Sequence, residues 1–332
     1  MTVYREFNGV MFIGDPHVSS RRPGDRKDKN FGETVVGKIK FCIDHCNEHG
    51  LLPVFLGDMY DTSYEPSESL KTKLARVLKS SKEVPLSNVG NHDIQHAVLT
   101  DDDSLAYLAA TGVIKLNAYA SALETIKVGG KLWGIGATPY GQEITGDARP
   151  FFPEADMIIW LTHHDLAFEN PYPGSMPLPE VKGAKLVVNG HMHLRKKTKK
   201  VGESIVFNPG NITRQFPDAI EHDPAVYILT KEGKLDKLEI PHERAIFNLK
   251  NFVRAISPGE AKSTAQQELE AAEENSEFVR MLDAESVLEA EKSDDGTIVL
   301  REIRMKFERD ETPKDVRDYI EEMHRRAVAA AA

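Results

Sequence analysis

The chain contains 332 residues, of which 40% are hydrophobic, 28% are charged and 8% are aromatic, and its formal net charge is −10. This composition excludes collagen-like and disordered chains, and no apolar run reaches the roughly 18 residues that a membrane-spanning helix requires. Two cysteines, Cys42 and Cys46, are too few for a disulfide framework. Residues 1–10 contain Arg5 and Glu6 and lack the apolar stretch of a secretory signal. We therefore expect a soluble cytoplasmic protein with no membrane partner.

The negative charge is concentrated near the C-terminus. Residues 251–332 contain 20 acidic and 12 basic side chains, a net charge of −8, whereas the first 250 residues have a net charge of only −2. The first part also contains two basic stretches, at 21–29 and 195–200. Such stretches can bind a polyanion, so the overall acidity does not exclude a polyanionic substrate. The alternative, and the commoner situation, is that they are solvated loops.

Short β-branched and apolar runs alternate with helical patterns up to about residue 250. Between the first two runs, apolar residues recur at helical spacing from Val35 to Cys46, which predicts a helix with one buried face. The alternation predicts an α/β fold in which helices cover central sheets, within one domain of residues 1–250. The predicted strands are Val10–Ile13, Pro53–Leu56, Leu86–Val89, Leu132–Ile135, Ile158–Leu161, Leu186–Val188, Ile205–Phe207 and Val226–Leu229.

The composition changes after residue 250. A Ser-Pro-Gly break at 257–259 precedes a Glu- and Ala-rich stretch that predicts a helix. Residues 297–307 alternate as a half-buried strand does, and the Thr-Pro pair at 312–313 is typical of the start of another helix. We expect residues 251–332 to form a small, acidic, mainly helical region that caps the first domain or binds a partner.

Polar residues fall at particular places in the first domain. In open α/β sheets, ligands bind at the carboxyl ends of the strands, because the loops there converge on one crevice. Five groups of acid, amide or imidazole residues directly follow predicted strands. They are Gly14-Asp15-Pro16-His17, Gly57-Asp58-Met59-Tyr60-Asp61, Gly90-Asn91-His92-Asp93, Thr162-His163-His164 and Gly190-His191-Met192-His193.

These residue types suit a pair of divalent cations. Two cations about 3.5 to 4 Å apart need a bridging anionic ligand, and Asp58 is the natural candidate. Imidazole, carboxylate and the carboxamide oxygen of Asn91 together favour Mn²⁺, Fe²⁺ or Zn²⁺ over Ca²⁺. Each group alone is more often a turn or a surface residue. However, six of the twelve histidines follow predicted strands, which favours the metal site over that alternative.

The ordered set of Asp-x-His, Gly-Asp-x-x-Asp, Gly-Asn-His-Asp, a later histidine after a strand, and Gly-His-x-His resembles the calcineurin-like metallophosphoesterase superfamily, over about residues 10–245. The resemblance implies a double β-sandwich flanked by helices, here with a small C-terminal α/β appendage. It also implies two divalent metals, with Mn²⁺ expected and Fe²⁺, Zn²⁺ or Mg²⁺ as alternatives. One metal would be held by Asp15, His17, Asp58 and His193, and the other by Asp58, Asn91, His163 and His191.

The resemblance also implies roles in catalysis. A hydroxide between the two cations would attack phosphorus in line, and His92 would stabilise the developing charge or protonate the departing oxygen. Asp93 and Asp61 would support the ligands. Of two adjacent histidines, we choose His163 as the ligand because it comes first after the strand, and His164 is the alternative.

The segment Phe207-Asn208-Pro209-Gly210-Asn211-Ile212-Thr213-Arg214 is similar to one in SbcD-type recombination nucleases, although Asn211 replaces their serine. This similarity favours a DNA nuclease, of exonuclease or endonuclease type. Smaller members of the superfamily carry a related segment, so a phosphodiesterase of cyclic nucleotides or other small diesters is the alternative. The third hypothesis is a non-catalytic binding protein. In the first case, DNA is the substrate, and residues 251–332 could bind a partner ATPase or mediate self-association.

Overall fold

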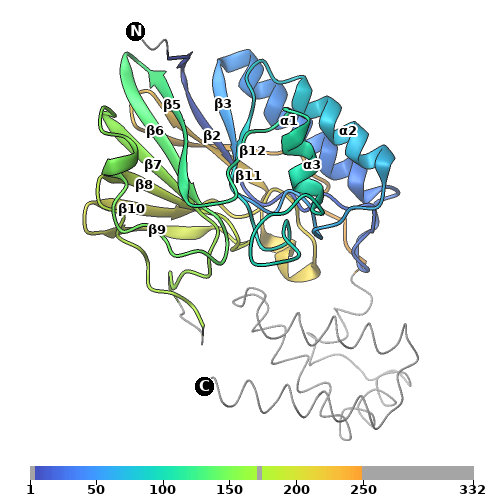
Figure 1. Ribbon diagram of the computed structural model, residues 1–332. Coiled ribbons are helices and arrows are strands. Elements are labelled where there is room, and N and C mark those ends of the chain that lie inside the picture. Colours follow the sequence, from blue (N-terminus) through green and yellow to red (C-terminus); the bar gives the residue numbers. More distant parts are fainter. Residues whose placement is uncertain (1–3, 170–173, 249–332) are drawn as a thin grey trace, which may run out of the picture. The chain divides into compact units, whose positions relative to one another are not determined.

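The computed structural model describes residues 4–169 and 174–248, and the predicted C-terminal appendage lies outside these residues. Two β-sheets form the framework of the described part (Figure 1). The smaller sheet has the strand order β12-β11-β2-β3-β4, and the larger has the order β1-β5-β6-β7-β8-β10-β9. The architecture is therefore a mixed α/β fold with two sheets and few helices, as the resemblance implied.

In the smaller sheet, three neighbouring strands run parallel, and two antiparallel strands complete one side. Three helices, α1, α2 and α3, pack on its outer face through one apolar cluster that includes Ile39 and Leu74. The strands are β2 (Gly9–Ile13), β3 (Leu51–Phe55), β4 (Leu86–Ser87), β11 (Ala225–Thr230) and β12 (Leu235–Glu239), and the helices are α1 (Phe31–His49), α2 (Glu68–Lys79) and α3 (Ser104–Ala110).

In the larger sheet, β6, β7, β8 and β10 run parallel, and the edge strand β9 runs antiparallel to β10. Loops and a short 3₁₀ helix at Arg149–Phe151 cover its outer face, around Trp160 and Phe152. The strands are β1 (Glu6–Phe7), β5 (Ser121–Val128), β6 (Lys131–Thr138), β7 (Met157–Thr162), β8 (Ala184–Asn189), β9 (Lys196–Val201) and β10 (Ser204–Asn208).

The main core lies between the two sheets. Buried residues of both sheets form one cluster, in which Phe12 and Val54 come from the smaller sheet and Ile135, Leu161 and Phe207 from the larger. These strands are buried on both faces, which explains why they appear in the sequence as continuous apolar runs. The ends of the strands are therefore the places where polar loops can gather without interrupting a core.

The predicted helix after the first strand is α1. Asn30 caps its start, because the Asn30 side chain accepts a hydrogen bond from the backbone N–H of Glu33. Gly50 ends it in the left-handed conformation, with φ of 65°. Cys42 and Cys46 are buried in its apolar face. The cysteines therefore pack in the core, as the spacing predicted.

Several elements were not predicted. The eight-residue strand β5 has a register shift between Ala122 and Glu124, so its buried residues do not alternate regularly. The edge strand β9 consists mostly of lysine, which is typical of a protected sheet edge but not of a buried strand. The helices α2 and α3 and the short strand β1 were also missed. The predicted strands all exist, with boundaries that differ by a few residues.

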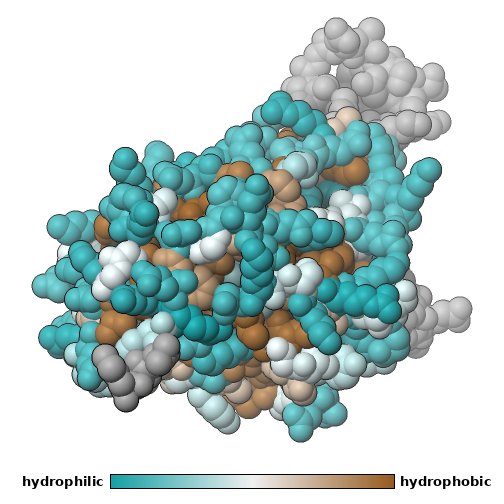
Figure 2. Space-filling view, turned by 90° about the horizontal axis from the view of Figure 1, so that it is seen from above, coloured by the Kyte–Doolittle hydropathy of each residue, from teal (hydrophilic) through white to brown (hydrophobic). Residues whose placement is uncertain are grey.

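The exposed surface is mixed. Hydrophilic side chains cover most of the face in Figure 2, and apolar side chains show between them. Large exposed apolar residues occur at scattered positions along the described chain, including Tyr64, Tyr107 and Tyr119. Within the described ranges, no helix combines the length and the apolar composition that crossing a membrane requires.

Candidate metal centre

The five polar groups meet at one end of the sandwich. Those after β2, β3 and β4 come from the smaller sheet, and those after β7 and β8 come from the larger. Contacts between His163 and two carboxylates join the sheets, since His163 Nε2 lies 3.1 Å from Asp58 Oδ2 and His163 Nδ1 lies 4.0 Å from Asp15 Oδ1. The site therefore lies across the two sheets rather than along the edge of one.

The backbone at this end is strained. His17, Asp58 and His191 have φ angles of 50°, 48° and 69°, and they are the only non-glycine residues of the described chain with positive φ. Residues other than glycine rarely adopt this left-handed backbone conformation. Such residues persist where the surrounding structure imposes them, and they are concentrated at functional sites. All three were predicted from the sequence as metal ligands.

Two glycines leave the space that the cluster occupies. A Cβ atom on Gly90 would lie 2.0 Å from Asp58 Oδ1, and a Cβ on Gly57 would lie 2.4 Å from His163 Nδ1. Gly57 also has φ of 121°, which favours glycine. The glycines that precede the polar residues thus allow a carboxylate and an imidazole to approach the neighbouring loop backbone.

Asp15, His17 and His193 form the first group. Their candidate ligand atoms all lie within 4.8 Å of one another, and the Nε2 atoms of His17 and His193 are 2.9 Å apart. Both carboxylate oxygens of Asp15 are buried without a hydrogen-bond partner. Burial raises the pKa of Asp15 and holds the pKa of His193 well below its ordinary value, an effect that neighbouring His17 reinforces. This group therefore presents unpaired acceptor atoms.

Asp58, His163 and His191 form the second group, with the same 4.8 Å limit between their candidate ligand atoms. Asn91 joins it, because Asn91 Oδ1 lies 2.9 Å from His191 Nδ1. Asp58 also approaches the first group, with its Oδ2 atom 3.7 Å from His17 Nε2. One Asp58 oxygen thus lies near both groups, which is the position that a bridging ligand requires.

His163 shows why a cation fits here. Its Nδ1 atom lies 2.9 Å from the carbonyl oxygen of Leu56, and since a carbonyl only accepts, Nδ1 donates its proton. Its Nε2 atom therefore faces the Asp58 carboxylate at 3.1 Å and needs a proton or a metal ion between them. Burial alone would lower the pKa of His163, but Asp58 and Asp15 raise it to about 9.

His164 has a different environment. Its Nδ1 atom accepts a hydrogen bond from the backbone N–H of His163 at 3.2 Å, and its Nε2 atom lies 2.9 Å from the carbonyl oxygen of Gln142. Burial lowers the pKa of His164 to about 4, so the ring is neutral at pH 7. Both ring nitrogens are thus hydrogen-bonded to backbone atoms. This geometry favours His163 over His164 as the candidate ligand.

His92 and Asp93 both follow β4, but they have different hydrogen-bond partners. His92 Nδ1 donates to the carbonyl oxygen of Asp61 at 2.7 Å, so a proton exchanged with a ligand must pass through Nε2. Asp93 accepts hydrogen bonds from the backbone N–H groups of Gly90 and Tyr60, at 2.9 and 3.2 Å. Burial and the charge of Asp58 raise the pKa of Asp93 to about 7. Asp93 therefore holds the loops after β3 and β4 together.

The charge of Asp58 depends on these histidines. Burial alone would raise the pKa of Asp58, but the nearby imidazoles of His163 and His92 outweigh this effect and hold the pKa well below its ordinary value. The carboxylate is therefore ionised at neutral pH. A buried, ionised carboxylate surrounded by nitrogen donors is a suitable ligand for a divalent cation.

Three further residues belong to this environment and were not assigned a role from the sequence. Asp165 Oδ2 lies 3.1 Å from His191 Nε2, and the ring of Tyr140 lies 5.5 Å from that of His191. Gln215 donates a hydrogen bond to Asp61 Oδ1 at 2.7 Å. Asp165 directly follows the two histidines, which could have indicated it. Nothing in the sequence placed Gln215 at this site.

One comparison with known proteins, the family match, agrees with this geometry. Residues 9–195 match the sequence profile of the calcineurin-like phosphoesterases. No curated protein matches the sequence. A solved structure that is similar is a 5'-nucleotidase precursor from Thermus thermophilus, with 14% identity, a TM-score of 0.42 and 70% of this chain covered. This chain spans 53% of the length of that one.

The matched segment covers more than half of the chain and contains all seven candidate ligands. Members of this family usually bind two divalent metals, and the His and Asp clusters of this site can hold metal ions. Both findings support a metal-dependent hydrolase that acts on phosphoester bonds. The chain belongs to the calcineurin-like phosphoesterase family.

Proposed function

We propose that this protein is a phosphodiesterase with two divalent metal ions and that its substrate is DNA. The observation that carries the metal-dependent chemistry is the Asp58 carboxylate, which lies 3.7 Å from His17 Nε2 and 3.1 Å from His163 Nε2, between two groups of buried acceptors. One ion would be held by Asp15, His17, Asp58 and His193, and the other by Asp58, Asn91, His163 and His191. Mn²⁺ is the ion that we propose.

When bound, two such ions would supply Lewis acidity to a water molecule and to the phosphoryl oxygens. The residues of this chain would hold the metal ligands in position. Leu56 orients His163 through its carbonyl oxygen, and such partners of metal ligands typically change metal affinity by about 10- to 100-fold. Asp93 fixes the loops that carry Asp58 and Asn91. It would therefore be a positioning residue.

His92 would transfer the proton to the leaving oxygen. The carbonyl oxygen of Asp61 keeps a proton on Nδ1, so an imidazolium formed in the site would lose its second proton from Nε2. The ring of His92 lies 4.8 Å from that of His17, at the border of the cluster. This position suits a group that contacts the leaving side of the substrate.

The edge strand β9 supports a nucleic-acid substrate. It begins three residues after His193, and Arg195 with the lysines at 196, 197, 199 and 200 gives the segment five basic residues. It has no strand partner on its outer side among the described residues. The side chain of Lys197 is 84% exposed. A basic strand that leads away from the centre could bind the phosphates that flank the scissile bond.

A substrate panel tests this proposal. Linear double-stranded DNA, single-stranded DNA, 2′,3′- and 3′,5′-cyclic nucleotides and a chromogenic diester would each be assayed with Mn²⁺ and with a chelator. We expect degradation of DNA that requires Mn²⁺ and is lost in Asn91→Ala. Hydrolysis of cyclic nucleotides without hydrolysis of DNA would reject the nuclease and favour a small-diester phosphodiesterase. No Mn²⁺-dependent hydrolysis of any of them would reject the catalytic function as well.

The same assay can test whether the basic strand β9 binds DNA. Replacing both Lys197 and Lys200 by Glu should raise KM for DNA and reduce its dependence on salt concentration. The turnover of the chromogenic diester should not change, because these side chains lie outside the metal-ligand groups. An equal loss on both substrates would show that β9 supports the fold and does not bind DNA.

A further inference from the structure

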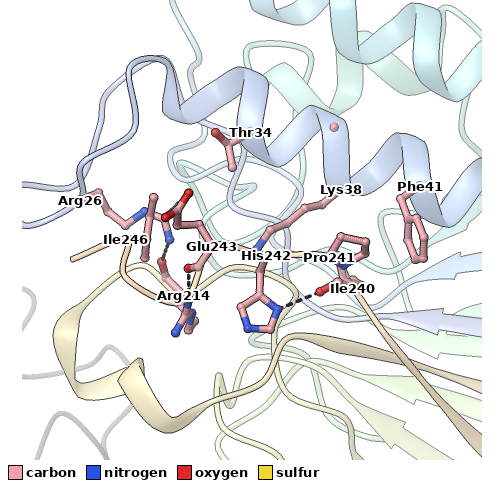
Figure 3. A pocket seen from close by; sticks show the side chains of 11 residues that line it. Arg26, Thr34, Lys38, Phe41, Arg214, Ile240, Pro241, His242, Glu243 and Ile246 are labelled. Atoms are coloured by element: carbon pink, nitrogen blue, oxygen red, sulfur yellow. Dashed lines mark hydrogen bonds between the residues drawn. The ribbon is translucent and has the colours of Figure 1, made fainter.

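A separate cavity lies outside the metal centre. A cavity of about 210 Å³ separates α1 from the segment that follows β12 (Figure 3). Thr34, Lys38 and Phe41 line it from the helix, and Arg26, Arg214, residues 240–243 and Ile246 complete its lining. Exposed residues at its rim, among them Gly37 and Glu243, open it to solvent.

The cavity and the metal centre lie at the same end of the smaller sheet. The strand β12 is antiparallel to β11, which is antiparallel to β2, so β12 and β2 run in the same direction. The segment that leaves β12 therefore emerges at the end where Asp15 and His17 leave β2. The order of strands places β12 two positions from β2.

Three basic side chains are buried around this cavity. Arg26 is 4% exposed, Lys38 is 6% exposed and Arg214 is 2% exposed. Lysine and arginine are almost never buried to this extent unless an acidic group pairs with them. An opposite charge is therefore expected close to these three side chains.

Of these three, only Arg26 has a carboxylate partner in the described part of the chain. Its guanidinium binds both oxygens of Asp28, at 2.7 and 2.9 Å. Lys38 Nζ donates to the carbonyl oxygen of Ile212 at 2.8 Å, and Arg214 donates to backbone carbonyl oxygens. Within the described ranges, the ion pairs with an N–O distance of 4.0 Å or less include neither Lys38 nor Arg214.

The backbone carbonyls satisfy donors but do not neutralise charge. A buried ion costs several kcal/mol unless an opposite charge compensates it. In agreement, burial lowers the pKa of Lys38 to about 7, and the charges of Arg26 and Arg214 lower it further than Asp28 raises it. The other acidic groups, Glu243 and Asp223, are exposed. The charge of Asp223 raises the pKa of Arg214, but by less than burial and the charge of Arg26 lower it.

We infer that this cavity binds a phosphoryl oxyanion, held by Lys38, Arg214 and Arg26, at a site separate from the metal centre. A lysine ammonium has three N–H donors, and only one hydrogen bond from Lys38 is made within the described part of the chain. Arginine and lysine are the side chains that bind phosphate oxygens most strongly. The anion would be either a free phosphate or a phosphate group of the substrate.

The segment 211–215 connects the two sites. The backbone N–H of Ile212 donates to the carbonyl oxygen of Gly14 at 3.3 Å, next to Asp15, while its own carbonyl accepts from Lys38. The backbone N–H of Asn211 donates to the carbonyl oxygen of His193 at 2.8 Å. An anion that reorients Lys38 would therefore act on backbone that contacts two candidate ligand loops.

Phosphate binding tests the inference independently of the proposed function. Full-length protein carrying Asp58→Asn, which disables the metal centre, would be titrated with inorganic phosphate in a calorimeter. We expect one phosphate per chain, and at least tenfold weaker binding after a further Lys38→Met substitution. Lys40→Met is the matched control, because Lys40 lies on the exposed face of α1 and pairs with Asp44. It should not change the affinity.

A second measurement covers the case in which Lys38→Met fails to fold. Crystals of the unmodified protein would be soaked with tungstate, an electron-dense oxyanion of similar shape. Anomalous density between Lys38 and Arg214 would support the inference. No phosphate binding to the Asp58→Asn protein, equal weakening by Lys38→Met and Lys40→Met, or tungstate elsewhere but not in this cavity would each overturn it.

The source of the anion is determined in protein that retains Asp58. If the cavity binds a phosphate of a DNA substrate, Lys38→Met should raise KM for an oligonucleotide several-fold more than KM for a chromogenic diester, whereas Lys40→Met should change neither. If it binds free phosphate, the variant should remove an effect of added phosphate on turnover of the small diester that the Lys40→Met protein retains.

Discussion

The metal centre and the basic cavity both contain buried polar side chains, but of opposite character. At the centre, acceptor atoms gather without enough donors, as both oxygens of Asp15 show. At the cavity, the charged donors Lys38 and Arg214 gather without an acidic partner among the described residues. Since burying an unpaired charge is costly, an excess of acceptors indicates a cation and an excess of charged donors indicates an anion. The comparison shows that a site's missing ligand can be inferred from the sign of the charge left unpaired.

The largest effect is expected from Asp58, the residue shared by both ligand groups. Asp58→Asn keeps the shape and removes the charge, so it should lower metal content and reduce diester turnover by at least about a thousandfold. Elemental analysis and a chromogenic assay would measure both. Asp44→Asn, on the exposed face of α1, should behave as the unmodified protein. A variant at Asp58 that kept its metals and most of its activity would break the assignment of the centre.

The next effect separates proton transfer from metal binding. His92→Gln should reduce turnover about a hundredfold while the metal content stays constant, because His92 is not one of the proposed ligands. His96→Gln is a suitable control, since His96 is exposed four residues later. If His92→Gln lost its metals together with its activity, His92 would be a ligand and the proposed role in proton transfer would be wrong.

A smaller effect tests how tightly the loops pack around the centre. Gly90→Ala introduces a Cβ atom that would lie 2.0 Å from Asp58 Oδ1, so we expect a loss of up to about 3 kcal/mol in the free energy of unfolding. Chemical denaturation would measure it. Gly24→Ala should change stability little, because no atom lies within 4 Å of the added Cβ. Equal effects of the two substitutions would contradict the crowding at Asp58.

The smallest effect concerns the basic cavity without its anion. The pKa of Lys38 is lowered to about 7 in the folded chain from an ordinary 10.5, so the unfolded chain binds more protons between these values and stability rises with pH there. From pH 7 to pH 9, the unmodified protein should gain about 2 kcal/mol relative to Lys38→Met. Denaturation of both proteins in phosphate-free buffer would measure this gain. A constant difference would show that Lys38 is charged at neutral pH without an added anion.

Much of the fold could be predicted because apolar runs and helical spacing are local signals. The helix α1 and the strands that lead to the centre were predicted in this way. The strand β5 was missed because its register shift between Ala122 and Glu124 disturbs the alternation. The strand β9 was missed because its lysines are tolerated at a sheet edge.

The metal centre and the basic cavity also differ in how far local sequence signals predict them. Candidate ligands such as Asp15 and His191 could be identified because each follows a predicted strand within a short motif. Arg26, Lys38 and Arg214 lie in no common motif, so their convergence could not be predicted. Residues 251–332 lie outside the described residues, and the partner ATPase or self-association expected for them stays a prediction.

The sequence by itself determined the residue types, the order of the motifs and the strands that present them, because these depend on neighbours in the chain. Only the tertiary structure decided which atoms face one another. It gave Asp58 its place between two groups and distinguished His163 from His164 by their backbone partners. It also gathered the basic residues at the cavity. The physical reason is that hydrogen bonds and charge pairing act over a few ångströms between atoms that the sequence separates by up to about 180 residues.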